Sequence, residues 1–567
     1  MADFDAIVIG SGFGGSVTAF RLAEAGLRVC LLERGKPFPP GSFPRSPHDT
    51  AANFWDPDHG HYGMFDIWSF SRLEAVVSSG LGGGSLIYAN VLLRMPENWF
   101  ANEHSDGSYE DWPVTRADLD PHYDTVEKMI GTQTYPIDQL PYRRTPKTRA
   151  MLEAAKRLSL DYELETELAP LAVTFANPGQ PAVPGLPIAG GENNLHESPR
   201  YTCRLVGECD IGCNFGSKNS LDFTYLSAAK RLGVDIRTHS EVRSFERIDG
   251  GFSVSYIKHP DCSSDPPSAR LRQVITSHRL ILSAGALGTT YLLLRNLSAF
   301  PVLSPALGQR FCGNGDFLGL VLKAKNQVDG VRAPRILDPS LGPVITVAMR
   351  MLDRLDGATG RGFYIEDAGY PQFVNWLIDD NMATEALRGL RFLRRRVWSR
   401  LTHSPKSQVG RQVSHALSKG LFTATSMPLL GMGREVPNGR LLLRQGHLDL
   451  DWSPAASRAY FTRLNKTMKR IASELGSSYT ANPLWLLNML ITVHPLGGAP
   501  MGRHPGEGVV NVFGQVFGYD GLSIADGSVL PGPVGANPSL TIAAMADRFA
   551  GWIIDDFSNK RRAVHVS

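Results

Sequence analysis

The chain has 567 residues, of which 43% are hydrophobic and 20% are charged, and its formal net charge at neutral pH is +3. This length exceeds one ordinary domain, so we expect two or more hydrophobic cores. The small net charge, with no basic patch interleaved with aromatic residues, argues against a nucleic-acid partner. Six cysteines in so long a chain do not describe a disulfide scaffold.

The first predicted unit is a strand, a turn, a helix and a second strand between Asp5 and Gly35. An apolar run ends at Ile9, a glycine-rich turn and a helical pattern follow, and the second strand at Val29–Leu32 ends in an acid. This order is typical of a dinucleotide-binding unit, in which the helix N-terminus faces phosphate charge. The opening residues enter the first strand directly, so we expect no signal peptide. No apolar run reaches the roughly 20 residues of a membrane span, and we expect a cytoplasmic protein, at most attached to a membrane surface.

The residues of this unit each have a physical purpose. Gly10 permits a tight turn, Gly12 lets the backbone approach a pyrophosphate, and Gly15 lets the helix pack closely on the strand. Glu33 can accept hydrogen bonds from ribose hydroxyls, and an acid there disfavours the 2′-phosphate of NADP. The predicted cofactor-binding segment of this turn comprises Gly10, Gly12, Phe13, Gly14 and Gly15.

The middle of the chain contains a second glycine cluster, GLGGGSLIYAN, within Ser78–Pro96. Between about 100 and 200 we expect helix only in pieces, such as Lys147–Leu158. Arg279–Ser298 reads as a buried strand, a tight turn and a helix, and mixed strands follow from about 320 to 485. We therefore predict a discontinuous nucleotide-binding domain over residues 1–100, 200–320 and 485–567. The insertions 101–199 and 321–484 would form a second, substrate-binding domain.

Three cysteines lie close together in the sequence YTCRLVGECDIGCNFG, at Cys203, Cys209 and Cys213. A metal or iron–sulfur site needs a fourth ligand, and neither His nor Cys lies nearby at the usual spacings. The ligand count favours a structural loop over a metal site, and we predict no metal.

The C-terminal part returns to strand and glycine-turn chemistry. A buried strand at Leu487–Val493 delivers His494 into HPLGG, where the following proline keeps it extended. Asp526 and Gly527 lie in a later turn, and Asn537 precedes Pro538. Ser539 can cap a helix that begins at about Leu540. A histidine on such a strand can be a core residue or a catalytic base, and the two glycine-rich loops favour the base.

Together the segments GSGFGG, GLGGGSLIYAN, LSAGALGT, HPLGG and DGSVLP…GANPSLTIAAMA resemble the glucose–methanol–choline oxidoreductases. Within that family the similarity is greatest to bacterial cholesterol oxidases that hold FAD non-covalently. The resemblance covers the nucleotide-binding domain throughout and the insertions more loosely. It implies an α/β fold in which a Rossmann-like FAD-binding domain, of the FAD-linked reductase type, carries a mixed-sheet α+β substrate domain.

The resemblance also implies roles for individual residues. The first glycine turn and Glu33 would hold the ADP half of FAD, and Val242 would meet the adenine through its main chain. His494 and Asn537 would face flavin N5 and bind the substrate hydroxyl. The remaining cofactor contacts would come from Gly82, Gly83, Gly84, Ser85, Asp526, Gly527, Asn537 and Pro538. The last predicted helix would point its N-terminus at the reduced flavin and stabilise its negative charge.

Two departures from the family pattern are informative. Members with covalent flavin carry a histidine shortly after the second glycine cluster, and Leu86, Ile87 and Tyr88 stand there instead. Covalent attachment is therefore disfavoured. Cholesterol oxidases also use a glutamate of the substrate domain for double-bond isomerisation. Glu366 is the candidate here, although the spacing before Trp376 places the family position nearer Asn375. The alternative for Glu366 is a hydrogen-bonded carboxylate at a strand end.

A strongly basic segment, Ala383–Leu401, repeats apolar residues at helical spacing with arginines on the other face. Such a helix can lie on an anionic membrane surface, or it can pack one face on its own domain and leave the other in solvent.

These features predict an FAD-dependent oxidation of a sterol-like secondary alcohol, by hydride transfer to flavin N5 with oxygen or another acceptor. A long-chain alcohol, a sugar derivative or a hydroxylated natural product is the alternative substrate. A flavoprotein without redox turnover, or a photoactive one, is the alternative of another class. NAD-dependent dehydrogenation is disfavoured because the HPLGG and DGS segments have no purpose in that scheme.

Overall fold

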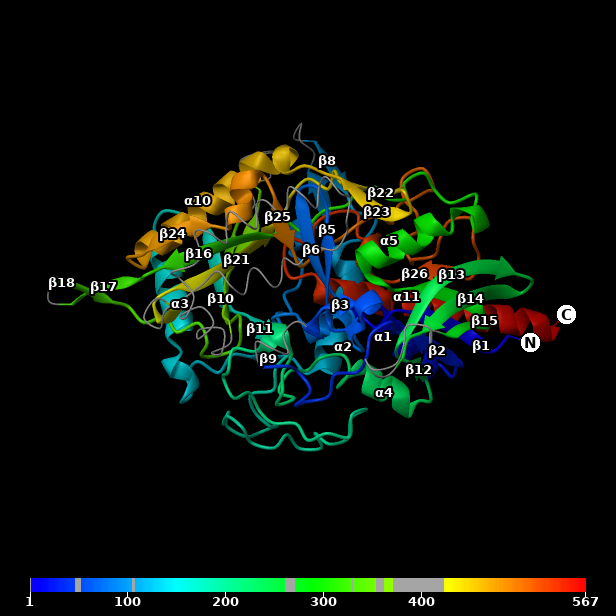
Figure 1. The fold of residues 1–567 in the computed structure, drawn as a ribbon, viewed down its shortest axis with the longest axis horizontal. Coiled ribbons are helices and arrows are strands. Elements are labelled where there is room, and N and C mark those ends of the chain that lie inside the picture. Colours follow the sequence, from blue (N-terminus) through cyan, green and yellow to red (C-terminus); the bar gives the residue numbers. More distant parts are fainter. Residues whose placement is uncertain are drawn as a thin grey trace.

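The computed structural model describes residues 2–45, 52–103, 108–260, 271–328, 330–352, 361–370 and 423–566. The predicted helix Ala383–Leu401 and the position Asn375 lie outside these residues. Two large sheets organise the described part of the chain, and Figure 1 shows them at opposite ends of the molecule. Over the same ranges, every helix is too short or too polar to cross a bilayer.

The seven-stranded sheet has the order β12-β2-β1-β15-β14-β13, with β26 paired to β15. Its parallel strands are β12 (Asp235–Arg237), β2 (Val29–Leu32), β1 (Phe4–Ile9), β15 (Leu271–Leu282) and β26 (Leu522–Ile524). An antiparallel extension is made by β14 (Gly251–Lys258) and β13 (Ser240–Ile248). All four residues of β2 are buried, as expected for a parallel strand that is covered on both faces. The predicted Rossmann-like unit is confirmed.

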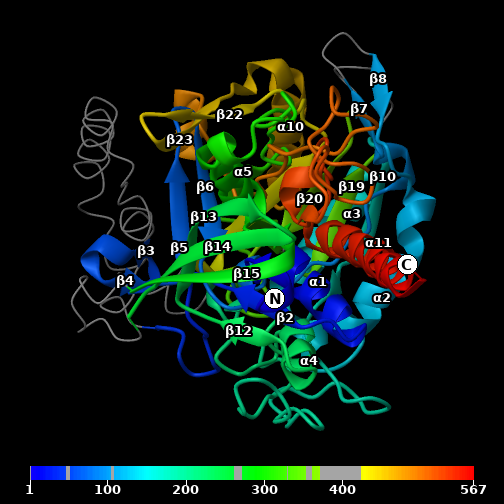
Figure 2. The ribbon, with the colours of Figure 1, turned by 90° about the vertical axis from the view of Figure 1, so that its right-hand side faces the viewer.

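Helices cover this sheet in the predicted places, together with two that were not predicted. Helix α1 (Phe13–Glu24) packs against α11 (Ser539–Val566), which also contacts α2 (Arg116–Ile130), and Figure 2 shows these three side by side. Helix α5 (Gly285–Arg295) follows β15 through the LSAGALGT turn, and α4 (Tyr225–Arg231) packs on α1.

Helix α2 differs from the expectation of helix only in pieces between 100 and 200. It runs for 15 residues and begins with a capping box, in which the side chains and backbone N–H groups of Thr115 and Asp118 bond reciprocally. Pro121 is the sixth residue of α2, so the helix lacks the hydrogen bond that a backbone N–H at this position would donate to the carbonyl of Ala117. The predicted piece at Lys147–Leu158 is confirmed as α3 (Pro146–Leu158).

The six-stranded sheet has the order β10-β19-β20-β21-β16-β24. Its strands are β10 (Leu164–Leu168), β19 (Val347–Met351), β20 (Phe363–Asp367), β21 (Met427–Gly433), β16 (Phe317–Leu322) and β24 (Ser478–Ala481). The sequence predicts a mixed sheet here, whereas every neighbouring pair in this sheet runs antiparallel. Helices α10 (Arg458–Glu474) and α3 contact each other and pack on the sheet.

Strand β20 lies between the two largest hydrophobic cores of the described residues. Phe363 and Ile365 belong to the core that includes residues of α3 and α10, whereas Tyr364 belongs to the core around the seven-stranded sheet. Because side chains alternate along a strand, Glu366 points to the same side as Tyr364, toward the seven-stranded sheet and its helices.

A three-stranded sheet joins β25 (Leu490–Thr492), β6 (Leu73–Ser78) and β5 (Phe65–Ser69). The strand predicted at Leu487–Val493 is shorter in the structure because Pro483–Leu487 form a 3₁₀ turn. The two-stranded sheets pair β3 (Trp55–Asp56) with β4 (His61–Tyr62), β7 (Ala101–Glu103) with β8 (Tyr109–Asp111), β9 (Gln133–Thr134) with β11 (Pro170–Leu171), β17 (Lys325–Val328) with β18 (Val331–Pro334), and β22 (Arg440–Arg444) with β23 (His447–Asp451). The division of the chain into domains stays a prediction.

Candidate active site

The two glycine clusters lie directly against each other. A Cβ atom on Gly83 would be 2.6 Å from the Cα of Gly12, and Gly83 itself has a φ of +53°. The first cluster is packed just as tightly underneath, because a Cβ on Gly14 would be 1.5 Å from the carbonyl oxygen of Ala525. Side chains at Gly14 and Gly83 would therefore push the backbone segments apart.

Two other glycines of these clusters have open space where a side chain would begin. A Cβ on Gly12 or on Gly84 would meet no atom within 4 Å, and neither residue has a positive φ. Packing within the protein does not require glycine at either position. A ligand that approaches the bare backbone does require it, as the phosphates of a dinucleotide do.

Glu33 lies at the end of β2, beside the first glycine turn. Its Oε2 accepts hydrogen bonds from the backbone N–H and the hydroxyl of Ser11, at 3.1 and 2.6 Å, and its Oε1 accepts one from the N–H of Gly35 at 2.9 Å. Ser240, at the start of β13, donates its N–H to the carbonyl of Glu33, which places Val242 two residues further along. The predicted adenosine contacts therefore lie together, and their roles stay predictions.

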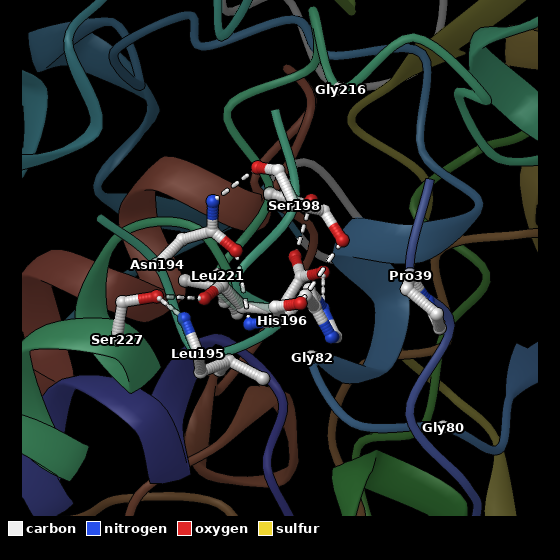
Figure 3. Close-up of polar contacts among 12 residues, drawn as sticks. Pro39, Gly80, Gly82, Asn194, Leu195, His196, Ser198, Gly216, Leu221 and Ser227 are labelled. Atoms are coloured by element: carbon white, nitrogen blue, oxygen red, sulfur yellow. Dashed lines mark hydrogen bonds and ion pairs between the residues drawn. The ribbon is translucent and has the colours of Figure 1, made fainter. Parts of the chain in front are cut away.

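A polar group packs on the second glycine cluster from the other side. Nε2 of His196 lies 2.7 Å from Oδ2 of Asp222, and both side chains are buried. Figure 3 shows His196 with Asn194, Leu195 and Ser227 in one hydrogen-bonded group beside Gly82. Leu221 donates its N–H to the hydroxyl of Ser85 at 3.0 Å. These contacts hold the loop of the second glycine cluster in place. No sequence motif predicted this polar group.

The C-terminal turn around Asp526 ties α5 to the first glycine cluster. Oδ2 of Asp526 accepts hydrogen bonds from the N–H of Gly285 and the hydroxyl of Thr289, and Oδ1 accepts one from the N–H of Ser528. Burial raises the pKa of the Asp526 carboxyl. Gly497, in the HPLGG loop, donates its N–H to the carbonyl of Gly527 at 2.9 Å. The fold therefore joins the DGS turn to the loop that carries His494.

His494 follows β25, and its ring faces a buried acid. Nδ1 of His494 lies 2.8 Å from Oδ1 of Asp316. Oδ2 of Asp316 accepts hydrogen bonds from the N–H of Val493 and the hydroxyl of Thr492, each at 2.9 Å. Asp316 is 3% exposed.

Asn537 lies two residues before α11 and contacts β20. Its Nδ2 donates to Oε2 of Glu366 at 3.4 Å, and Pro538 accepts the N–H of Ile542 in the first turn of the helix. Oδ1 of Asn537 and Oε1 of Glu366 are both buried without a partner among the described residues. Unpartnered buried polar atoms are costly, so their clustering makes this position a candidate for ligand binding.

Two carboxyl groups of this region hold their protons unusually firmly. Burial, reinforced by Asp367 and Asp316, raises the pKa of Glu366 to about 8. Burial raises the pKa of Glu435, whose Oε1 accepts the N–H groups of Gly313 and Gly315, to about 7. The Glu366 carboxyl therefore keeps its proton to a higher pH than an exposed glutamate does.

Comparisons with known proteins identify the family. A family model described as GMC oxidoreductase matches residues 454–546, and one described as an NAD(P)-binding Rossmann-like domain matches residues 8–66. A cholesterol oxidase of Mycobacterium tuberculosis is 31% identical over 564 residues, which cover 97% of this chain and 90% of that protein. The chain belongs to the GMC oxidoreductase family.

More distant relatives of this GMC oxidoreductase also align along nearly its whole length. A cholesterol oxidase of Acinetobacter baumannii is 27% identical over 97% of this chain and 94% of that protein. A long-chain-alcohol oxidase of Arabidopsis thaliana is 22% identical over 98% of this chain and 68% of that protein. The chain is therefore an oxidoreductase of a family that oxidises alcohols with FAD.

The residues of this GMC oxidoreductase fit a flavin dinucleotide. Gly12 and Gly84 leave room at the bare backbone for phosphate groups. Asn90, six residues after Gly84, is fully buried, and both polar atoms of its side-chain amide lack a partner within the described ranges. The neighbouring hydroxyl of Tyr88 is also buried without one. Exposed glycine backbone can contact phosphate groups, and buried polar side-chain atoms can bind a polar ring. Both features suit a flavin dinucleotide.

The cysteine-rich loop packs beside the second glycine cluster, and Lys218 bonds to both segments. Nζ of Lys218 donates to the carbonyls of Leu86, Tyr88 and Cys209. Cys203, Cys209 and Cys213 line one small cavity together with this lysine. Burial raises the pKa of the Cys209 thiol to about 11. In the described part of the chain, His, Cys, Asp and Glu side chains form no group of three or more that could hold a metal ion.

Sequence reasoning missed Asn314 and Asp316. Asn314 donates its Nδ2 to the carbonyl of Ala536 at 2.9 Å, and its Oδ1 accepts the N–H of Gly535 at 2.8 Å. The segment Gly313–Asp316 therefore bonds both to the backbone before Asn537 and to His494. Its sequence signal was slight, an Asn between two glycines followed by an acid at the start of an apolar strand.

Proposed function

We propose that this GMC oxidoreductase oxidises an apolar, sterol-like secondary alcohol to a ketone. It would hold FAD non-covalently and use oxygen or another electron acceptor. One observation carries the proposal, namely that Gly313–Asp316 is bonded both to His494 and to the backbone before Asn537. Two segments that are distant in the sequence, each with a polar side chain of a hydroxyl-binding type, are thereby fixed to the same short stretch of chain.

His494 and Asn537 would hold the substrate hydroxyl between them. His494 would take the hydroxyl proton, because its Nδ1 is engaged by Asp316 and its other ring nitrogen is left for substrate. Asn537 would donate the second N–H of its Nδ2 to the oxygen of the hydroxyl, since the first is directed at Glu366. FAD bound at the glycine clusters would supply the acceptor for the hydride of the carbinol carbon.

Two further features suit this chemistry. Helix α11 begins at Ser539, next to Asn537, so its free N–H groups and positive dipole end lie at the site. The raised pKa of Glu366, about 8, reduces the negative charge beside Asn537 at neutral pH. Glu366 stays the candidate for proton transfer in double-bond isomerisation, a step in which it would have to accept a proton in its ionised form. The alternative for Glu366 is a hydrogen-bonded carboxyl group of structural use.

The choice of a sterol rests on similarity. Two relatives named cholesterol oxidases align over 97% of this chain, which supports a sterol-like substrate. The second candidate is a long-chain alcohol, which is favoured by the similarity to the plant oxidase. A cytoplasmic location and membrane contact through Ala383–Leu401 remain predictions.

The test is anaerobic reduction of the purified yellow protein. Stoichiometric bleaching of the flavin absorption by a 3-hydroxysterol, and not by fatty alcohols or sugars, would support the proposal. Admission of oxygen should then restore the colour and release hydrogen peroxide if oxygen is the acceptor. Bleaching by a fatty alcohol alone would transfer the assignment to the second candidate. A flavin that no alcohol bleaches would leave the non-redox or photoactive flavoprotein.

The mode of flavin attachment is tested on the same sample. After acid precipitation the yellow colour should stay in the supernatant, because Leu86, Ile87 and Tyr88 offer no histidine for a covalent bond. Colour retained in the washed pellet would overturn the non-covalent assignment.

A further inference from the structure

Within the described ranges, the ring of His494 has a hydrogen-bonding partner at one of its two nitrogens. Its Nδ1 lies 2.8 Å from Oδ1 of Asp316, a residue 178 positions earlier in the chain. Asp316 precedes β16, and His494 follows β25, so the contact joins the large antiparallel sheet to the small sheet that carries the histidine.

The carboxylate of Asp316 is held from three directions. Val493 donates its N–H and Thr492 lies with its hydroxyl 2.9 Å away, both at Oδ2. The same hydroxyl accepts the backbone N–H of His494 at 3.0 Å. An ionised carboxylate can only accept hydrogen bonds, so the oxygen that faces His494 acts as an acceptor.

The segment that carries Asp316 is itself fixed on both sides. Glu435 accepts the N–H groups of Gly313 and Gly315 through one oxygen, and Asn314 bonds to the backbone at Gly535 and Ala536. Asp316 therefore cannot move without disturbing the backbone before Asn537. The position of the acid relative to both candidate catalytic residues is built into the fold.

A neutral imidazole has one nitrogen that donates and one that accepts, and its neighbours decide which is which. An acceptor at Nδ1 requires the proton there, which leaves the lone pair on Nε2. We propose that Asp316 is the positioning residue of the reaction, which fixes His494 in the Nδ1–H tautomer so that Nε2 can accept the substrate's hydroxyl proton. This inference rests on the proposed function for its consequence in turnover, but the tautomer itself can be observed without substrate.

The first experiment reads the tautomer. Protein labelled with ring-¹⁵N histidine is studied by NMR, and the signals of His494 are assigned by their loss in His494→Gln. We expect a protonated Nδ1 and an unprotonated Nε2 in the wild type. In Asp316→Asn, whose amide can both donate and accept, we expect the signals to shift toward a mixture or toward the other tautomer. Unchanged His494 signals in Asp316→Asn would overturn the proposal.

The second experiment measures flavin reduction in a stopped-flow instrument under anaerobic conditions. For Asp316→Asn we expect a rate about 10- to 100-fold below wild type, the usual scale for a residue that orients another. The substrate concentration for half-maximal rate should change much less, and Asp316→Glu should recover part of the loss. A wild-type rate in Asp316→Asn with FAD bound would contradict the proposal.

A matched control guards against a general effect of removing a buried acid. Asp5, at the start of β1, is also buried and accepts hydrogen bonds from Arg28, but it lies at the end of the strand opposite the glycine turn. Asp5→Asn should leave both the His494 signals and the reduction rate unchanged.

If Asp316→Asn does not fold, Thr492→Val removes one partner of the carboxylate at nearly constant volume. It should shift the same NMR signals in the same direction, and unshifted signals would count against the proposal.

Different results would contradict the proposed function and the positioning role of Asp316. If no alcohol reduces the wild-type flavin, the proposed function fails, and the NMR comparison still decides whether Asp316 fixes the tautomer. If an alcohol reduces wild type but His494→Ala is equally fast, the role of His494 as base fails in the same way. If His494→Ala is slow and Asp316→Asn is both fast and unshifted, only the positioning role is lost.

Discussion

Nδ2 of Asn537 donates to Oε2 of Glu366 at 3.4 Å, and this contact joins the segment before α11 to strand β20 in the middle of the six-stranded sheet. The two side chains share one boundary between the hydrophobic cores. Each also keeps one buried oxygen without a partner among the described residues. A substrate hydroxyl placed here would meet polar atoms from β20 and from the segment before α11.

The first prediction concerns His494. His494→Ala should lower the rate of alcohol oxidation by about two to four orders of magnitude, because a general base contributes on that scale. The measurement is turnover per bound flavin with the alcohol identified in the anaerobic screen. The flavin spectrum and the thermal midpoint serve as controls for a folded, loaded enzyme. A loaded variant that turns over at a nearly normal rate would rule out the role.

The second prediction separates two glycines of one turn. Gly14→Ala should prevent folding, because its Cβ would lie 1.5 Å from the carbonyl oxygen of Ala525. Gly12→Ala should fold with the thermal stability of the wild-type apoprotein, since its Cβ meets no atom within 4 Å. It should nevertheless bind FAD at least about 10-fold more weakly, a loss of about 1.4 kcal/mol, because the methyl group occupies the space of the phosphates.

Flavin content after gel filtration and a titration of apoprotein with FAD measure this difference. Gly551, in α11, also has open space at its Cβ position and lies far along the helix from its N-terminus. Gly551→Ala should therefore both fold and bind FAD normally. Equal FAD affinity in Gly12→Ala and wild type would remove Gly12 from the cofactor site.

The third prediction follows from the raised pKa of Glu366. Its folded-state pKa of about 8 lies above the ordinary value of 4.5, so the folded state keeps a proton that the unfolded state loses between these values. The free energy of unfolding should therefore fall as the pH rises from about 4.5 to about 8. Glu366→Gln keeps a neutral acceptor for Asn537 and removes this contribution to the pH dependence of the free energy of unfolding.

Thermal midpoints of both proteins between about pH 5 and pH 9 provide the measurement. Glu435, with a pKa raised to about 7, contributes a term of the same sign to both proteins, so the quantity of interest is the difference between them. The midpoint of Glu366→Gln relative to wild type should increase with pH. A difference that is constant over this range would show that Glu366 is charged at neutral pH.

The fourth prediction concerns the buried ion pair beside Glu366. Nζ of Lys147 donates to Oδ2 of Asp367 and to the carbonyl of Val344, and neither charged side chain is exposed. Lys147→Met should reduce the free energy of unfolding by about 3–5 kcal/mol, because it leaves a buried carboxylate without its cation. Denaturant unfolding followed by tryptophan fluorescence measures this.

A double variant tests the cause of that loss. Lys147→Met combined with Asp367→Asn removes both charges and keeps an acceptor for the N–H groups of Thr346 and Val347. It should be more stable than Lys147→Met alone. A double variant that is less stable would mean that Lys147 acts through packing and not through charge.

The local elements of this protein could largely be predicted because their signals are short-range. The glycine turn after β1, the strand β2 and the strand–turn–helix of β15 and α5 are where hydrophobic period and turn residues place them. Helix α11 begins one residue before the predicted start. Helix α2 was not predicted, although the residues of its capping box are present in the sequence. The charged and proline-rich residues around it obscure the helical spacing of its apolar positions.

The parts that could not be predicted depend on contacts between distant segments. Asp316 and His494 are 178 residues apart, and Asn537 and Glu366 are 171 apart. No periodicity or motif relates such positions, because their proximity arises only when two sheets pack. The same holds for the ion pair of Lys147 with Asp367 and for the buried pair of His196 with Asp222.

The sequence by itself determined the dinucleotide turn, its acid and the order of the C-terminal loops, because backbone approach and helix polarity are local requirements that only certain residues meet. Only the tertiary structure decided that Gly12 and Gly84 face open space while Gly14 and Gly83 are packed against backbone. It also decided which acid faces His494 and that Glu366 is buried beside Asn537. Burial and the distance between charges are properties of the packed chain, and they set the protonation states on which the proposed chemistry depends.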